Sequence, residues 1–167
     1  NKRELLREKS IFASAKQKWS HSNRLNSVSR LLYKTAQEFP ERTFLITDSR
    51  KVSYKYFFTI VKIFADKLRK KGVNSGDRVL LYSHNSPEFY AAYCAIWHLG
   101  AVVVPLNNYL HKKEMQGILK DAQCKILLSS QELSSKLFEA CEDKDISGSE
   151  ILLLEKEIDW DSELGMA

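Results

Sequence analysis

The sequence predicts an α/β domain with a largely parallel sheet and covering helices. Three observations support this class: short apolar runs alternate with stripes of helical period, Ser and Pro residues precede the helices, and Gly or turn residues follow them. Strands that alternate with helices are typical of a parallel sheet. With 167 residues, of which 44% are hydrophobic and 28% charged, the chain suits one soluble globular domain or a large part of a bigger one.

The first predicted elements are a helix and two short strands. Apolar residues at helical spacing over 28–39 indicate a helix, with Ser27 as its N-cap and Pro40 as its stop. The segments 43–47 and 51–53 have strand composition, and the three residues between them, Asp-Ser-Arg, are typical of a turn.

The clearest helix covers residues 54–68, where aromatic and aliphatic residues recur at i, i+3, i+4 and i+7. Ser53 can cap this helix, Gly72 can end it in a left-handed turn, and Lys62 is assigned to its outer face. The apolar run 79–82 then indicates a buried strand.

The run 89–106 contains no Asp, Glu, Lys or Arg, which raises the question of a membrane span. Ser86 as N-cap and Pro87 at the first helical position begin a helix, and Gly100 stops it well short of the ~20 residues that a span needs. The β-branched residues that follow predict a strand ending at Pro105. The run is therefore a buried helix and strand, and Trp97 and the neighbouring Tyr and Phe side chains are assigned to the core.

The alternation continues to the end of the chain. Helices are predicted at 111–119 and 132–141, the second with Ser129 and Glu132 in capping-box spacing, and strands at 125–128 and 151–154. The acidic tail with Trp160 has no regular pattern. We expect a basic arm at 1–26, the α/β scaffold at 27–155, and a tail or the start of a next segment at 156–167.

The net charge of +5 is concentrated at the N-terminus. Residues 1–30 hold eight Lys and Arg against two Glu, a balance of +6, so the remaining residues carry −1. Such an arm can contact nucleic acid or an anionic lipid surface. A solvated linker or first helix is the simpler interpretation, because aromatic residues are sparse and no nucleic-acid motif follows. We therefore expect no nucleic-acid partner, and at most peripheral membrane contact through the arm.

The cysteines, Cys94, Cys124 and Cys141, are odd in number and widely spaced, and the four His have no metal-ligand spacing. Neither a disulfide framework nor a zinc site is indicated, and a reducing cytoplasm fits best. The chain begins with Asn, has no signal-peptide pattern, and is expected to be part of a longer polypeptide.

Several short motifs resemble those of one family when they are taken in order. They are Ser53-Tyr54 opening a helix, Gly76-Asp77-Arg78-Val79, Asn85-Ser86-Pro87-Glu88-Phe89, Gly100-Ala101 and Pro105-Leu106-Asn107. Their order and spacing over about eighty residues make residues 52–130 similar to the N-terminal portion of the adenylate-forming ligases, the AMP-forming acyl-CoA synthetases. The resemblance implies the large-domain fold of that family.

The resemblance also implies a parent enzyme that activates a carboxylic acid with ATP and Mg²⁺ to an acyl-adenylate and then transfers the acyl group to a thiol such as CoA. Acetate, aromatic acids, amino acids and long-chain fatty acids are all used in the broader family, and among them we expect a fatty acid. Two positions depart from the family pattern: Tyr56, where an acidic residue is common, and His111, where Thr or Ser is common. Each departure removes half of a helix capping box, at a cost of about 0.5–2 kcal/mol if nothing compensates.

The nucleotide machinery of that family is not found in this sequence. The Ser/Thr/Gly-rich loop ending in Pro-Lys-Gly, the ribose-binding acidic residue and the C-terminal lysine have no counterpart, and no GxGxxG or P-loop occurs. Only Ser147-Gly148-Ser149 resembles the start of a phosphate loop, and its sequel is wrong. We predict no catalytic residue and no bound cofactor in this chain alone, with the remainder of the ligase domain as its partner.

The best local candidates for ligand contact are His84 and Asn85. They follow the strand 79–82, and ligands gather at strand carboxyl ends in open α/β sheets. Helix capping by Asn85 and Ser86 accounts for these residues more simply. Asp77 is interpreted as a locally paired turn residue, and His98 as a hydrogen-bonded core histidine.

Two further functions remain open beside the ligase scaffold. A parallel sheet that lacks later strands leaves an unpaired edge, so the chain can instead be a non-catalytic interaction module that pairs through this edge. Binding of nucleic acid or lipid through residues 1–30 is the third.

Overall fold

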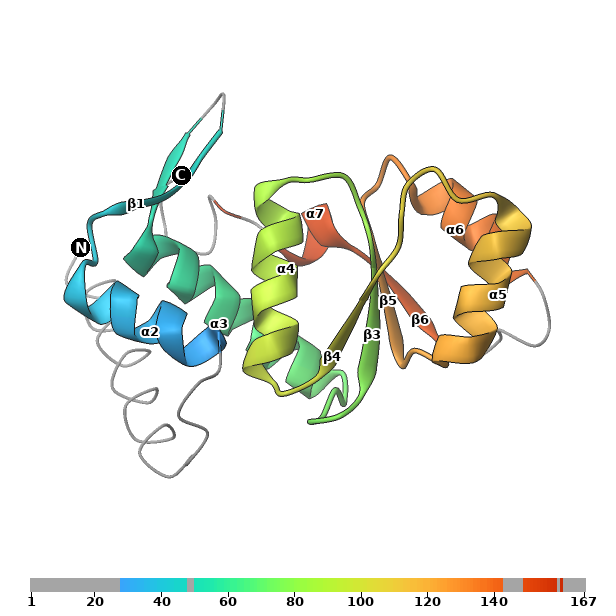
Figure 1. The fold of residues 1–167 in the computed structure, drawn as a ribbon, viewed down its shortest axis with the longest axis horizontal. Helices are drawn as coiled ribbons and strands as arrows, with labels where there is room; N and C mark the ends of the chain where they lie inside the picture. The colour runs from blue at the N-terminus through green and yellow to red at the C-terminus, as the bar shows by residue number, and fades with distance from the viewer. Residues whose placement is uncertain (1–27, 48–49, 143–148, 159, 161–167) are drawn as a thin grey trace. The chain divides into compact units, whose positions relative to one another are not determined.

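The computed structural model describes residues 28–47, 50–142, 149–158 and 160 (Figure 1). These residues form two compact units. The first contains the described residues up to Ile60 together with Trp160, and the second runs from Val61 to Ile158. The helix α3 (Tyr54–Lys70) contributes to both units.

The first unit consists of α2 (Val28–Glu38), the antiparallel pair β1 (Thr43–Ile46) and β2 (Lys51–Ser53), and the beginning of α3. The predicted helix and strands are confirmed to within one or two residues. The predicted cap Ser27 and most of the predicted turn lie outside the described residues.

The buried face of α2 does not coincide with its apolar residues. Ser29, Leu32 and Ala36 are buried, whereas Val28 and Leu31 are 52% and 66% exposed. The helix therefore buries a face that includes a serine. Apolar periodicity does not predict this face, because it counts only hydrophobic residues.

Trp160 completes the core of the first unit, although the tail around it has no regular pattern in the sequence. Its side chain is buried, and its ring lies against the rings of Tyr56 and Phe57. The Tyr56 hydroxyl donates a hydrogen bond to the Trp160 carbonyl. Ser53 Oγ accepts from the Tyr56 N–H at 3.3 Å, so one half of the capping box is kept and the tyrosine gains a partner in Trp160.

The second unit contains a four-stranded parallel sheet in the order β4-β3-β5-β6. The strands are β3 (Arg78–Tyr82), β4 (Val102–Pro105), β5 (Ile126–Ser129) and β6 (Glu150–Leu153). Leu80 in β3 pairs with Val104 on one side and Leu127 on the other. The short continuous apolar runs are those of a sheet covered on both faces.

Four helices accompany this sheet: α4 (Pro87–His98), α5 (Lys112–Ala122), α6 (Ser134–Cys141) and the short α7 (Leu154–Glu157). Figure 1 shows α5 and α6 on one face of the sheet and α4 with α7 on the other. The core under α5 and α6 includes Leu80, Met115, Leu127 and Leu137. The α/β class with a largely parallel sheet is thus confirmed.

The helix α4 begins and ends as the sequence predicts. Ser86 Oγ accepts from the Phe89 N–H at 3.1 Å, Pro87 is its first residue, and Gly100 follows with a φ of +72°. Within the described residues, none of the helices has the length and apolar character required to span a bilayer. The assignment of Trp97 to the core is wrong, because its side chain is 41% exposed.

Two further predictions about helices are corrected. Lys62 is buried rather than on the outer face of α3. The capping box of Ser129 and Glu132 does not form: α6 begins at Ser134, and Ser129 is a fully buried residue of β5 whose hydroxyl donates to the Ser130 carbonyl. Ser129 belongs to β5 instead, because it pairs with Tyr82 of β3 in the parallel sheet.

His111, which stands where Thr or Ser is common in the similar family, keeps half of the helix capping box. The backbone N–H of His111 donates to the Glu114 carboxylate at 2.7 Å. The beginning of α5 therefore retains the reciprocal bond from the third helical residue.

Candidate functional site

Polar side chains gather at the carboxyl edge of the four-stranded sheet in the second unit. Ser83 and His84 follow β3, Asn108 follows β4, and Ser130 follows β5. The carboxyl ends of parallel strands open at the same edge, which is where open α/β sheets bind ligands. We refer to Ser83, His84, Asn108, Ser130 and Glu132 as the carboxyl-edge cluster.

Asn108 is the centre of this cluster. Its side-chain Nδ2 donates to the Ser83 carbonyl at 3.3 Å and lies 3.0 Å from Nδ1 of His84. Its backbone carbonyl accepts from Lys136 Nζ at 3.2 Å and from the Tyr82 hydroxyl at 3.4 Å. Asn108 thus joins the segments that follow β3 and β4 to helix α6.

His84 links the cluster to the segment before α6. Its Nε2 lies 3.6 Å from a carboxylate oxygen of Glu132, while both side chains remain more than half exposed. At this distance and exposure, the contact contributes little to stability.

Two buried side-chain polar atoms in the described part of the chain have no hydrogen-bond partner, and both belong to this cluster. They are Asn108 Oδ1 and Ser130 Oγ. Ser130 is only 6% exposed, and its backbone N–H donates to the Tyr82 carbonyl at 3.1 Å. Because buried polar atoms nearly always have partners, an edge with two such atoms is the place where a further group is expected to bind.

Of the two candidate residues suggested by the sequence, the structure places one in this cluster. His84 belongs to it, whereas Asn85 is exposed and the helix cap beside it is Ser86. A role of His84 and Asn85 in ligand binding stays a prediction. Sequence reasoning missed Asn108 and Ser130, although both follow predicted strands and could have been found by inspecting every strand end rather than the first.

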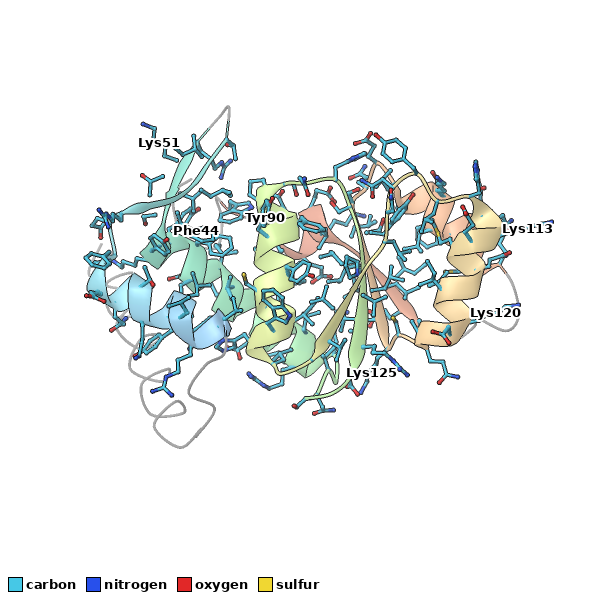
Figure 2. The ribbon with its side chains drawn as sticks, in the orientation of Figure 1. Phe44, Lys51, Tyr90, Lys113, Lys120 and Lys125 are labelled. Atoms are coloured by element: carbon cyan, nitrogen blue, oxygen red, sulfur yellow. The ribbon has the colours of Figure 1, made fainter. Side chains whose placement is uncertain are left out.

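The opposite, amino edge of the sheet carries a different polar group. Asp77 accepts from the Asn74 N–H at 2.8 Å, which confirms it as a locally paired turn residue. Lys125 adds a contact from far along the chain, since its Nζ donates to Asp77 at 3.1 Å and to the Gly72 carbonyl at 2.5 Å. The Asn74 N–H and the Lys125 ammonium hold the pKa of the Asp77 carboxyl below its usual range. Figure 2 shows Lys125 at this end of the strands.

No group of three or more His, Cys, Asp or Glu side chains in the described part of the chain could hold a metal ion. Of the Ser-Gly-Ser stretch at 147–149, only Ser149 is described, and its hydroxyl donates to the Cys124 carbonyl at 2.7 Å. The basic arm lies outside the described residues.

The three cysteines are free thiols. Burial raises the pKa of Cys94 and that of Cys124 to about 11, and it raises the pKa of Cys141 as well. Since the thiolate is the reactive form, none of them has the properties of a nucleophile.

Comparison with known proteins now adds to this geometry. The protein-family model described as AMP-binding enzyme matches residues 32–165. A curated relative, the 3-hydroxybenzoate–CoA/4-hydroxybenzoate–CoA ligase of Thauera aromatica, is 34% identical over 92 residues, which cover 55% of this chain and 18% of that ligase.

Two solved structures share the fold. The O-succinylbenzoate coenzyme A synthetase of Bacillus subtilis, in complex with AMP, has a TM-score of 0.68 and 25% identity, covering 79% of this chain and 32% of that one. The N-terminal subdomain of Klebsiella oxytoca NpsA, in complex with 3-hydroxybenzoyl-AMSN, has a TM-score of 0.65 and 26% identity, covering 80% and 31%. This chain therefore spans about a fifth of the curated relatives and about a third of the solved ones.

Proposed function

Because the chain belongs to the family of AMP-binding enzymes, we propose that it is the N-terminal scaffold of an ATP-dependent acid–thiol ligase. The whole enzyme converts a carboxylic acid into an acyl-adenylate and then into an acyl-CoA. The observation that carries the proposal is the family match over residues 32–165, together with a parallel sheet whose carboxyl edge holds two unpartnered buried polar atoms.

The contribution of these residues is structural support of the site rather than chemistry on the nucleotide. Acyl-adenylate formation needs donors and a cation on the transferring phosphate. Two described lysines at the ends of the strands are already engaged, Lys125 with Asp77 and Lys136 with the Asn108 carbonyl. We therefore propose that ATP, Mg²⁺ and CoA are held mainly by the remainder of the ligase domain, and that this chain alone is inactive.

The acid substrate is proposed to be a fatty acid, as the resemblance implies. Aromatic acids are the alternative, because the names of the Thauera aromatica ligase and of the NpsA complex both contain hydroxybenzoate groups. A panel containing both classes decides between them.

The test is ATP–pyrophosphate exchange with fatty and aromatic acids. We expect exchange by the full encoded polypeptide or by this chain mixed with its missing half, and none by residues 1–167 alone. Exchange by residues 1–167 alone would refute the scaffold proposal. A full polypeptide that exchanges with neither class of acid would refute the ligase proposal itself.

The second candidate is a non-catalytic interaction module that pairs with another chain through an edge strand of the sheet. Two observations favour it. The side chain of Val102 in the edge strand β4 is 48% exposed, and β4 and β6 each have one strand neighbour among the described residues. A full polypeptide that lacks exchange but captures a second chain, with the capture abolished by Val102→Lys, would favour this candidate.

Location and the role of the arm complete the proposal. We propose a cytoplasmic enzyme, with residues 1–26 as a linker that makes at most peripheral contact with anionic lipid. Sedimentation with anionic vesicles at low and high salt tests this contact. Binding that survives deletion of residues 1–26 would exclude the arm as its cause.

A further inference from the structure

The side chain of Asn108 faces groups whose hydrogen-bonding character is fixed by chemistry. Its Nδ2 lies 3.3 Å from the backbone carbonyl oxygen of Ser83. A carbonyl oxygen can only accept, so the carboxamide atom that faces it must be the NH₂ group. If the carboxamide were turned over, two acceptor oxygens would face each other. Ser83 therefore determines the orientation of the Asn108 carboxamide without reference to any other side chain.

This orientation has a consequence for His84. The second N–H of the same NH₂ group points to Nδ1 of His84, at 3.0 Å. Since this NH₂ group only donates, Nδ1 must accept and cannot carry a proton. In this arrangement the ring proton is on Nε2. Glu132 faces Nε2 at 3.6 Å, too far for a direct hydrogen bond, but its negative charge favours a proton on that side.

The backbone carbonyl of Asn108 and its side-chain N–H groups are also engaged. Lys136 and Tyr82 bind the carbonyl, and both side-chain N–H groups are used. Of the side-chain atoms, only Oδ1 has no partner among the described residues, and it is buried. The Asn108 side chain is thus held in one orientation with a single acceptor left over.

We propose that His84 is a positioning residue: as the neutral Nε2-protonated ring, it holds Asn108 so that Oδ1 is presented as a hydrogen-bond acceptor at the carboxyl edge. A group that hydrogen-bonds to Oδ1 of Asn108 must carry an N–H or O–H donor. An unprotonated phosphate or carboxylate oxygen cannot bind to it directly, because both atoms would be acceptors. This inference concerns the two side chains themselves and does not depend on the ligase proposal.

The test is NMR of the ring nitrogens of His84 in the full polypeptide labelled with ¹⁵N-histidine. The His84 signals are assigned by their loss in His84→Asn. In the unsubstituted protein, at a pH where the ring is neutral, we expect an unprotonated Nδ1 and a protonated Nε2. A predominantly Nδ1-protonated neutral ring would overturn the proposal.

The decisive variant is Asn108→Asp, which keeps the shape but replaces the donor by an acceptor. The carboxylate can bind the ring only if Nδ1 carries a proton, so we expect the protonation of Nδ1 to switch. An unchanged neutral ring in this variant would contradict the proposal. If Asn108→Asp does not fold, Asn108→Ala gives the same information through a fall in the fraction of Nε2-protonated ring, and an unchanged fraction would overturn it.

A second measurement follows the partner residue. His84→Leu removes the acceptor, whereas His84→Asn places an oxygen where Nδ1 was. We expect hydrogen exchange of the Asn108 side-chain amide to become about fivefold faster in His84→Leu, a change typical of one lost hydrogen bond, and to stay within about twofold in His84→Asn. Equal acceleration in both variants would show that His84 acts only by filling space.

Discussion

The two edges of the parallel sheet in the second unit use their polar residues in opposite ways. At the amino edge, Asp77, Lys125 and the Gly72 carbonyl bind one another, and the Ser149 hydroxyl binds the Cys124 carbonyl. At the carboxyl edge, two buried oxygens have no partner among the described residues. The polar side chains of the amino edge bind groups within the chain, whereas the carboxyl edge has two side-chain oxygens without a partner among the described residues.

The backbone shows the same contrast. Three glycines with positive φ, Gly72, Gly76 and Gly100, lie in the turns that enter the strands at the amino edge. The segments that leave the strands contain no described residue with positive φ. An edge with tight turns whose polar groups hydrogen-bond to one another is typical of a structural role. An edge with polar atoms that lack partners is typical of a binding role.

The largest effect is expected for Gly100→Ala at the amino edge. Its φ is +72°, and an added Cβ would lie 2.8 Å from Ser75 Oγ. We expect the free energy of unfolding, measured by urea denaturation, to fall by about 1–3 kcal/mol because a left-handed alanine is strained. The matched control is Gly117→Ala in α5, where the Cβ would meet open space. That variant should gain about 0.5–1 kcal/mol, and a loss in both would point to a general intolerance of alanine.

The second effect compares two serines at opposite edges. Ser149→Ala removes a hydroxyl that donates at 2.7 Å, and should lower the free energy of unfolding by about 1 kcal/mol. Ser130→Ala removes a buried hydroxyl without a partner, and should change it by less than about 0.5 kcal/mol. Thermal unfolding of both variants in the full polypeptide measures the difference. A larger loss for Ser130→Ala would show that its partner lies elsewhere in the protein.

A smaller effect is the pH dependence that Asp77 contributes. Its pKa is lowered in the folded state, so its ionised form favours folding above the pKa of the unfolded chain. This contribution is lost as the pH falls through the lowered folded value. We expect the stability difference between the wild type and Asp77→Asn to be full at neutral pH and to vanish in strong acid.

The matched background for that experiment is Lys125→Met, which removes the cation that faces Asp77. In this background, the pH-dependent difference should shrink but persist, because the Asn74 N–H remains. A difference that stays constant down to strong acid would contradict the assignment to Asp77.

The smallest effect concerns thiol reactivity at the amino edge. Burial raises the pKa of Cys124 to about 11, so about one thiol in ten thousand is ionised at pH 7. We expect an aromatic disulfide reagent to label Cys124 at least about tenfold more slowly in the native protein than in urea. Equal rates would show that this part of the edge opens readily.

Local chemistry made much of the fold predictable. Ser86 and Pro87 begin α4, Gly72 and Gly100 end helices, and the runs in β3 and β5 are too short and too apolar for anything but buried strands. Each of these signals acts between residues close together in the chain. The element types and their order follow from them.

Long-range competition decided the cases in which prediction failed. Ser129 and Glu132 have capping-box spacing, but strand pairing with β3 draws Ser129 into the sheet. Trp160 lies in a tail without periodicity, yet it is buried against Tyr56 and Phe57. Spacing rules cannot register partners that are a hundred residues away.

The class of the fold, the bounds of most elements and the strand end at which His84 lies follow from local signals in the sequence, namely caps, turns and apolar period. Which strand ends meet depends on tertiary packing, which brings Asn108 and Ser130 to the same edge as His84. The physical reason is that a hydrogen bond between strand-end loops depends on the order β4-β3-β5-β6, which is set by packing of the whole sheet.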